Sequence, residues 1–319
     1  MLEPRREVAA LPPAVHGGDA PDGVLDCSTG VSPLSPPAAV MAAWRGADVT
    51  RYPHPTALPL RRAIAARHGV GEEAIVVGAG SVELVWALAR AFGGAGRRVG
   101  WVAPAFGEYA QAARASGAET MAVAVDAACD LLFVARPGNP TLAVPPVESA
   151  RAGLVVVDEA YQPLCDGVPA VAPSDGVAVL RSLTKVFALP GLRLGYLVAS
   201  PIVARAVQAS LPPWNVSQPA MAAGLAALAE PTEPVRAAVA ALRERLVARL
   251  AALGVLPVAA GGTFVVVDVG DARRFGAAML ARGVRVRDCA SFGLPHLVRV
   301  GVRGDDDQER LIAAWRSCA

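Results

Sequence analysis

The chain has few aromatic residues, no concentration of charge and no long apolar segment. Only 5% of its 319 residues are aromatic, and 30 basic residues stand against 28 acidic ones, for a formal net charge of +2. The basic residues are dispersed, whereas nucleic-acid binding uses basic runs interleaved with stacking rings. No apolar run approaches the roughly 18 residues of a membrane span. We therefore expect neither a nucleic acid nor a membrane as a partner.

The cysteines are also few, and their spacing carries no motif. They are Cys27, Cys129, Cys165, Cys289 and Cys318. Their number is odd and no two form a CxxC pair, which argues against a disulfide framework or a zinc ribbon, so no metal site is predicted. The first 15 residues mix charges with prolines and lack the sustained apolar stretch of a signal peptide. These features favour a cytoplasmic location.

Lysine is almost absent. Of the 30 basic residues only Lys185 is a lysine, which leaves 29 arginines. A lysine is ordinarily a solvated surface residue, but this one is flanked by Leu183, Val186 and Phe187 in a chain that otherwise uses arginine. Arginine stays protonated, and only lysine can act as a primary amine nucleophile and form a Schiff base. Lys185 is therefore the leading candidate for a catalytic residue.

The composition is 54% hydrophobic, enough for a large core, and from about residue 57 helical stretches alternate with short Val- and Leu-rich strands. The predicted elements are helices at 57–68, 81–92 and 106–116 and strands at 74–77, 98–103, 120–125, 131–135, 154–157, 177–180 and 195–198. Continuous apolar strands separated by helices indicate a mainly parallel sheet covered on both faces. The fold class is therefore α/β.

After Pro201 the pattern changes to long helices, followed by strands around one more helix. The predicted elements are helices at 201–210, 216–229 and 234–253 and strands at 263–267 and 297–302. They indicate a second, smaller α+β domain. The first 50 residues offer no strand for the large sheet and are expected to join the small domain. We predict an N-terminal arm over residues 1–50, a large domain over 51–230 and a small domain over 231–319.

Polar residues follow several of the predicted strands. Asp158 comes directly after a buried strand, and in open α/β sheets ligands gather at the carboxyl ends of strands. A helix N-cap is the ordinary alternative. A buried carboxylate needs a cationic partner, for which a protonated heterocyclic nitrogen is one candidate. Asn139, in RPGNPT, follows another strand and lies at the same edge, although it could simply serve the turn.

A glycine-rich turn, Gly78–Glu83 (GAGSVE), joins a predicted strand to a predicted helix. Backbone N–H groups at a helix start and the hydroxyl of Ser81 form an anion cradle. Such a turn is weak support by itself. Combined with Ser182 and Arg193, which follow another strand, it predicts a phosphate site.

Together these motifs resemble the fold type I pyridoxal-phosphate enzymes. They are, in chain order, Gly80-Ser81, Asn139-Pro140, Asp158 with Tyr161, Ser182-x-x-Lys185 and Arg193-x-Gly195-Tyr196. The resemblance extends from about residue 26 to 315. It is closest to the branch that holds histidinol-phosphate aminotransferases and the threonine-phosphate decarboxylases of cobalamin biosynthesis. It implies a large domain with a mainly parallel sheet, a smaller α+β domain, and pyridoxal 5'-phosphate as the cofactor.

The resemblance also implies cofactor-binding roles. Lys185 would hold the cofactor covalently, Asp158 would pair with its pyridinium nitrogen, and Asn139 and Tyr161 would bond its ring hydroxyl. The phosphate would be held by Gly80, Ser81, Ser182 and Arg193.

Two aromatic residues have implied roles as well. Phe106, in PAFGEY, would stack on the ring, with Tyr109 the less favoured choice. Tyr52, in RYPHPT, is similar to the tyrosine that reaches the cofactor phosphate of the neighbouring subunit, which implies a homodimer with shared sites. Core packing is the alternative for Phe106 and Tyr52.

The two ends of the chain carry the implied substrate contacts. The stretches 26–33 and 286–303 resemble the decarboxylases more than the aminotransferases. Arg287 and Arg299 would approach the anionic groups of a phosphorylated amino acid, with surface salt bridging as the alternative. Ser32 stands where the family's arm usually carries an asparagine before proline, so that substrate contact is altered.

The implied reaction is decarboxylation of L-threonine O-phosphate to an aminopropanol phosphate. The alternatives are an aminotransferase of the histidinol-phosphate type and a non-catalytic binding protein that keeps the fold.

Overall fold

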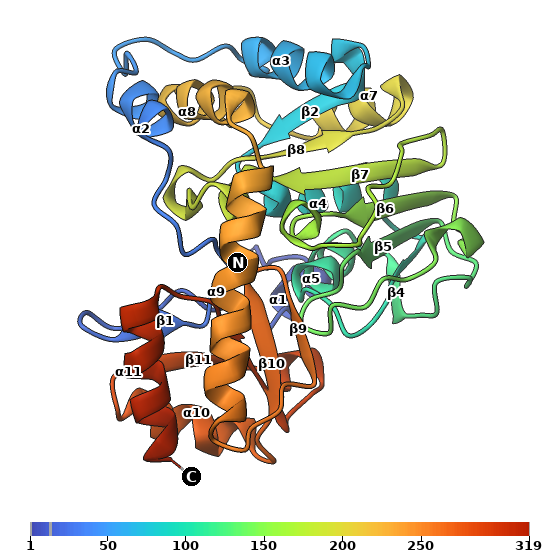
Figure 1. The fold of residues 1–319 in the computed structure, drawn as a ribbon. Helices are drawn as coiled ribbons and strands as arrows, with labels where there is room; N and C mark the ends of the chain where they lie inside the picture. The colour runs from blue at the N-terminus through green and yellow to red at the C-terminus, as the bar shows by residue number, and fades with distance from the viewer. Residues whose placement is uncertain (1, 13–14, 319) are drawn as a thin grey trace.

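The structure is a computed structural model that describes residues 2–12 and 15–318. It contains two sheets with helices packed around them (Figure 1). The larger sheet has the strand order β2 (Ile75–Gly78), β8 (Gly195–Val198), β7 (Val177–Ser182), β6 (Leu154–Asp158), β5 (Leu131–Ala135), β3 (Arg98–Trp101) and β4 (Glu119–Ala122). Strand β8 runs in the direction opposite to the other six strands of this sheet. The predicted α/β class with a mainly parallel sheet is confirmed.

The helices of the large sheet are α3 (Leu58–His68), α4 (Ser81–Phe92), α5 (Glu108–Ala115), α6 (Leu183–Val186), α7 (Pro201–Ala209) and α8 (Gln218–Ala229). Short 3-10 turns lie at Glu72–Ala74, Val147–Ser149, Gln162–Leu164, Pro190–Leu192 and Ala290–Phe292. The predicted elements of this region are present, with boundaries that differ by a few residues. The helix predicted at 106–116 begins two residues later, at Glu108, so Phe106 lies in the loop before it.

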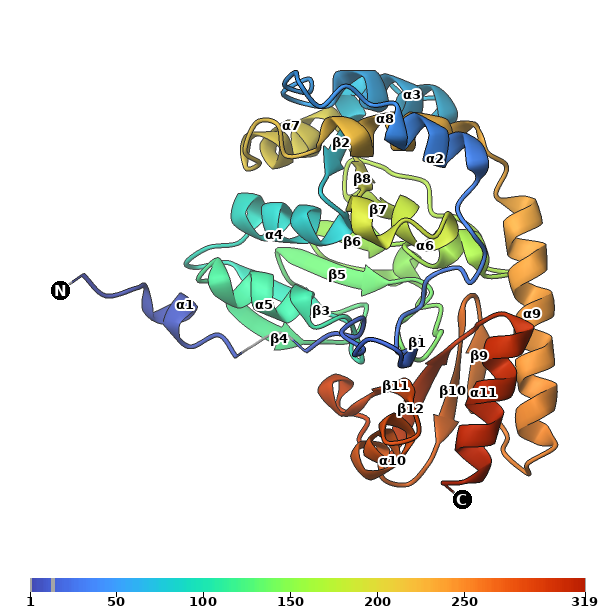
Figure 2. The ribbon, with the colours of Figure 1, turned by 90° about the vertical axis from the view of Figure 1, so that its left-hand side faces the viewer.

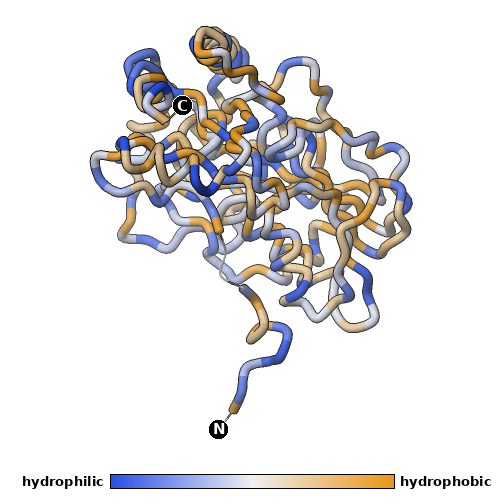
Figure 3. Tube along the Cα trace, turned by 90° about the horizontal axis from the view of Figure 1, so that it is seen from below, coloured by the Kyte–Doolittle hydropathy of each residue, from blue (hydrophilic) through white to orange (hydrophobic). Residues whose placement is uncertain are grey.

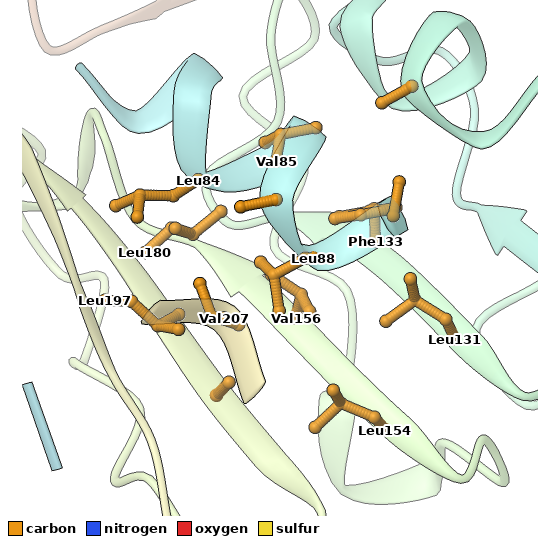
Figure 4. Close-up of a cluster of buried hydrophobic side chains, with 14 of the residues drawn as sticks. Leu84, Val85, Leu88, Leu131, Phe133, Leu154, Val156, Leu180, Leu197 and Val207 are labelled. Carbon is orange, nitrogen blue, oxygen red and sulfur yellow. The ribbon is translucent and has the colours of Figure 1, made fainter. Parts of the chain in front are cut away.

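Helix α4 illustrates how sequence produces this packing. Leu84, Val85 and Leu88 recur at helical spacing and are fully buried against the sheet, which contributes about 1.5–3 kcal/mol for each side chain. In Figure 4 Leu84 lies beside Leu180 of β7, and Leu88 lies beside Val156 of β6. The helix starts at Ser81 because the Gly80 backbone turns there. This places the first N–H groups of α4 at the carboxyl edge of the sheet.

The smaller sheet has the order β1 (Leu25–Cys27), β11 (Val284–Asp288), β12 (Leu297–Gly301), β10 (Phe264–Asp268) and β9 (Ala259–Gly261), and its helices are α9 (Glu233–Ala251), α10 (Ala272–Leu280) and α11 (Asp305–Arg316). Sequence reasoning missed β1, β9 and β11. Two of them are only three residues long, and β11 alternates valine with arginine, a pattern without a continuous apolar run.

The N-terminal segment divides between the two sheets. Strand β1 pairs with β11, in parallel, whereas α2 (Ala38–Arg45) places Val40 in the core of the large sheet. Figure 2 shows α1 (Arg6–Ala9) at the margin, beside α5. Helix α9 also spans both regions, since Val239 packs with the large sheet and Leu246 with the small one.

The hydropathy of the chain follows this layering. In Figure 3 the hydrophilic segments lie mostly at the periphery and along the N-terminal segment. Within residues 2–12 and 15–318, no helix is both long and apolar enough to cross a bilayer.

Candidate active site

A cavity of about 690 Å³ lies at the carboxyl ends of β5, β6 and β7. The predicted site residues that line it are Gly80, Ser81, Phe106, Asn139, Asp158, Tyr161, Ser182, Lys185, Arg193, Arg287 and Arg299. They come from both sheets and from several separate loops. The geometry therefore brings together residues that are more than 200 positions apart in the sequence.

One end of the cavity has the groups of an anion cradle. Gly80 has a φ of +82°, and a Cβ built on it would lie 2.6 Å from Nη2 of Arg193. Only glycine lets this turn come so close to the guanidinium. The N-terminus of α4, the Ser182 hydroxyl and Arg193 all border this end, so a phosphate group fits it.

Lys185 lies in α6, directly after β7, with its side chain half-buried in the cavity. Its Nζ is 5.5 Å from the centroid of the Tyr161 ring. Burial favours the neutral form of Tyr161, but the charges of Lys185 and Arg299 outweigh it and lower the pKa of the phenol. The Tyr161 hydroxyl is therefore a good hydrogen-bond donor to a ligand bound in the cavity beside the Lys185 amine.

Asp158 ends β6 and is 8% exposed. Its Oδ2 accepts a hydrogen bond from the Tyr109 hydroxyl at 2.7 Å, and its Oδ1 accepts one from the Ala160 N–H at 2.9 Å. Burial raises the pKa of Asp158 above its ordinary value, against the lowering effect of these two donors and of Lys185. A cation placed beside this carboxylate would offset the cost of its burial.

Arg299, on β12, is 5% exposed and points into the cavity. Its Nη1 donates to Asn139 Oδ1 at 2.5 Å and its Nη2 to the Ser28 carbonyl at 2.6 Å, while its Nε is buried without a partner among the described residues. The guanidinium is thus held by two neutral oxygens. Its positive charge is not paired by either of them and can attract an anionic ligand in the cavity.

Arg287, on β11, is 7% exposed and also borders the cavity. Its Nη2 donates to the Val15 carbonyl and to the Ser291 hydroxyl at 2.8 and 2.6 Å. Burial lowers the pKa of Arg287, and the neighbouring charge of Arg299 acts in the same direction. Neither arginine is placed for surface salt bridging.

The two aromatic residues of PAFGEY differ in position. Phe106 is half-buried at the cavity wall, while Tyr109 is 1% exposed and stacks on Phe133 with ring centroids 5.1 Å apart. The Tyr109 hydroxyl is directed to Asp158. Phe106 is accordingly the better placed of the two to cover a bound ring, as the sequence favours.

Two predicted site residues do not line the cavity. Tyr52 is 83% exposed and its ring centroid lies 5.2 Å from that of Trp214. Ser32 is buried behind Lys185: its N–H donates to the Lys185 carbonyl, and its Oγ accepts from the Leu34 N–H. Within a single subunit, Ser32 holds the backbone at Lys185 and Leu34 in place, and Tyr52 does not reach the cavity.

Sequence reasoning missed His16, which lines the cavity. Its Nε2 is 2.7 Å from Glu108 Oε1, and Trp86 Nε1–H donates to Glu108 Oε2 at 2.8 Å. The hydrogen bond with His16 lowers the pKa of Glu108. A histidine before two glycines was the only signal in the sequence, and no local pattern connects it to Glu108, 92 positions away.

Another missed feature is the close approach of the N-terminal arm. A Cβ on Gly30 would lie 2.8 Å from the Tyr161 hydroxyl, so only glycine allows the arm to pass the ring at this distance.

Among the described residues, no group of three or more histidines, cysteines or carboxylates could hold a metal ion.

The chain is similar to known proteins over almost its whole length. The chain is 33% identical to the histidinol-phosphate aminotransferase of Paramagnetospirillum magneticum over 356 residues, which covers 98% of this chain and 97% of that protein. The solved histidinol-phosphate aminotransferase from Sinorhizobium meliloti, in complex with pyridoxal-5'-phosphate, matches with a TM-score of 0.83 at 23% identity, covering 98% of this chain and 96% of that one.

The L-threonine-O-3-phosphate decarboxylase from Porphyromonas gingivalis matches with a TM-score of 0.80 at 24% identity, covering 92% of this chain and 99% of that one. At these identities the two solved structures establish a shared fold. A sequence profile described as aminotransferase class I and II matches residues 23–314. With nearly its whole length matched, the chain belongs to the aminotransferase class I and II family.

Proposed function

We propose that the protein is a pyridoxal-phosphate enzyme that decarboxylates L-threonine O-phosphate. The observation that carries this proposal is the pair Arg287 and Arg299. Both guanidinium groups are buried at the same cavity as Lys185, and among the described residues neither forms an ion pair with a carboxylate. Buried charges are costly without a partner. A substrate that carries a carboxylate and a phosphate supplies two anionic partners, one for each arginine.

The cavity fits the cofactor as well as the substrate. When bound, pyridoxal phosphate supplies a protonated ring that withdraws electrons from the bond broken at the substrate α-carbon. The turn at Gly80 and the side chain of Arg193 would hold its phosphate. Asp158 would keep the ring nitrogen charged, and Phe106 would cover the ring. Lys185 would hold the cofactor through its amine, and the same amine would return a proton to the substrate α-carbon.

The arginines orient the bond that breaks. Arg299 is held from two sides by Asn139 and Ser28, so its guanidinium plane is set before the substrate arrives. A planar fork binds a carboxylate or a phosphate in a defined orientation. His16, whose Nε2 contacts Glu108, lines the same cavity. Loss of carbon dioxide requires this orientation. It also requires that the site does not bind the carboxylate more tightly in the ground state than in the transition state, because such binding would raise the barrier.

A second candidate is an aminotransferase that acts on histidinol phosphate. It is favoured by the relatives, since the 33%-identical protein of Paramagnetospirillum magneticum carries that name. The same cradle and the same lysine serve both reactions. The difference lies in whether a carboxylate or a proton leaves the α-carbon, and in the second substrate that a transamination needs.

The substrate assay separates these candidates. Purified protein loaded with pyridoxal phosphate is expected to release carbon dioxide from threonine phosphate. It should act on unphosphorylated threonine roughly 100-fold less efficiently, because the charge-assisted phosphate contacts supply much of the orientation. The measurement is carbon dioxide release, with glutamate formation from histidinol phosphate and 2-oxoglutarate followed in parallel. Glutamate formation without carbon dioxide release would replace the decarboxylase with the aminotransferase.

We also propose a homodimer in which Tyr52 enters the partner's site. Its high exposure beside Trp214 supports this, because a large aromatic pair on the surface suits an interface. Mixing inactive Lys185→Ala protein with impaired Tyr52→Ala protein should recover about a quarter of wild-type activity, since one site in each hybrid dimer is intact. Hybrid formation is verified by native mass spectrometry. Hybrids that recover no activity would place Tyr52 outside the partner's site.

A further inference from the structure

The hydroxyl of Tyr109 contacts the carboxylate on which the proposed function depends. It donates to Asp158 Oδ2 at 2.7 Å, and the Ala160 N–H donates to Oδ1 at 2.9 Å. Each carboxylate oxygen therefore has one fixed donor, and the two together set the rotation of the side chain. A carboxylate accepts about four hydrogen bonds, so acceptor capacity is left for a group in the cavity.

Tyr109 is itself firmly held. Its ring is parallel to that of Phe133, with an interplanar angle of 5°, and meets Phe106 edge-on at 5.8 Å between centroids. Burial, with the nearby charge of Asp158, raises the pKa of Tyr109 well above its ordinary value. The hydroxyl therefore keeps its proton at neutral pH and acts as the donor in this pair.

We propose that Tyr109 is a positioning residue that keeps Asp158 ionised and directed at the cofactor ring nitrogen. The inference rests on the proposed function, because it concerns the same site. A carboxylate that already accepts a hydrogen bond is a weaker base. With Tyr109 bound to Oδ2, the proton between Asp158 and the ring nitrogen stays on nitrogen, where the chemistry needs it.

The surroundings of Asp158 support this assignment to Tyr109. Burial alone favours the neutral carboxyl and raises its pKa. The groups that act on it in the opposite direction are, in decreasing order, the Tyr109 hydroxyl, the Ala160 N–H and the Lys185 charge. The other ionisable groups coupled to it are Tyr161 in the cavity and Glu159 next in the chain. Lys185 becomes bonded to the cofactor, which leaves Tyr109 as the main side chain that sustains the charge.

The test uses Tyr109→Phe, which keeps the ring and its stacking and removes only the hydroxyl. Two quantities are measured. In cofactor-free protein, the Asp158 carboxyl is titrated by carbon-13 NMR, and we expect it to titrate at higher pH than in the wild type. The dissociation constant for pyridoxal phosphate is expected to rise about tenfold, the effect of one hydrogen bond to a charged group.

Tyr196→Phe is the matched control. Tyr196 is also a buried tyrosine, but its hydroxyl lies 3.1 Å from His68 Nε2 and outside the cavity. Removing that hydroxyl should leave both the Asp158 titration and the cofactor affinity unchanged. Equal changes in the two variants would mean that loss of any buried hydroxyl loosens the site, which would overturn the proposal.

A second substitution keeps the inference testable if Tyr109→Phe fails to fold. Fluorotyrosine at position 109 is a stronger donor of nearly the same shape and should move the Asp158 titration to lower pH. A titration unchanged by either substitution in folded protein would overturn the role of Tyr109. This outcome is independent of the substrate assay, because the titration needs neither cofactor nor substrate.

Discussion

Lys185→Ala is expected to lower kcat by roughly three orders of magnitude or more, because one substitution removes both the nucleophile and the proton donor. Cofactor should still bind, since the cradle of Gly80, Ser182 and Arg193 is intact. The measurements are the turnover number and the cofactor content. Lys185→Arg is the matched control: it retains a long cationic side chain in α6 but offers no primary amine.

The near absence of lysine makes the site of cofactor attachment easy to identify by chemical labelling. Lys185 is the only lysine of the chain, so the N-terminus is the only other primary amine to which the cofactor could be fixed. Borohydride reduction of the wild type should therefore place the cofactor on the peptide that contains residue 185. A small external amine should restore part of the activity of Lys185→Ala, because it can occupy the volume left by the side chain. Label found at the N-terminus alone would refute the assignment.

Residues that follow strands were the ones that sequence reasoning could find. Asp158, Asn139 and Lys185 each come shortly after an apolar strand, and parallel strands end at one edge of a sheet. Local pattern is then sufficient to bring them together. The fold class was predictable for the same reason, since buried parallel strands are continuous apolar runs.

Contacts between distant segments were not predictable in this way. Arg287 donates a hydrogen bond to the Val15 carbonyl, 272 positions away, and His16 contacts Glu108, 92 positions away. Both pairs depend on the path of the N-terminal segment, which contacts β11 at Val15 and α5 at His16, and no local periodicity encodes that path. The family resemblance implied the position of Arg287 but not its hydrogen-bond partners.

Side-chain direction was also beyond the sequence. Tyr109 and Phe106 are three positions apart in PAFGEY and both border the cavity, but Phe106 is half-buried and Tyr109 is almost fully buried. The helix was expected to begin at Phe106. It begins at Glu108, so Phe106 lies in the loop before it, and the Tyr109 hydroxyl donates to Asp158, a contact that neither residue's neighbours in the sequence indicate.

The asparagine variant of Asp158 is expected to separate stability from activity. Asp158→Asn is nearly isosteric: the amide oxygen can accept from the Ala160 N–H, and the amide NH₂ can donate to the Tyr109 oxygen. Turnover should fall by roughly two orders of magnitude or more, because no carboxylate then keeps the ring nitrogen charged. The cofactor-free variant should nevertheless be at least as stable as the wild type at pH 8.

The direction of this stability difference follows from the burial of Asp158. The folded pKa of Asp158 is raised, chiefly by desolvation, so its neutral form is the one that the fold favours. Its contribution to stability is present below the unfolded pKa of about 3.9 and is lost as pH rises through the folded pKa. The Asn variant has no proton to lose, so its stability advantage should be largest at pH 8 and shrink as the pH falls toward 4.

Thermal unfolding of both cofactor-free proteins between pH 4 and 8 measures this difference. An Asn variant that is less stable than the wild type at every pH would show that the carboxylate stabilises the turn at Ala160 and is not a group held at a cost for catalysis. Binding of pyridoxal phosphate should reverse the order, because only the aspartate gains an ion pair with the ring nitrogen. We therefore expect the cofactor to stabilise the wild type more than the variant.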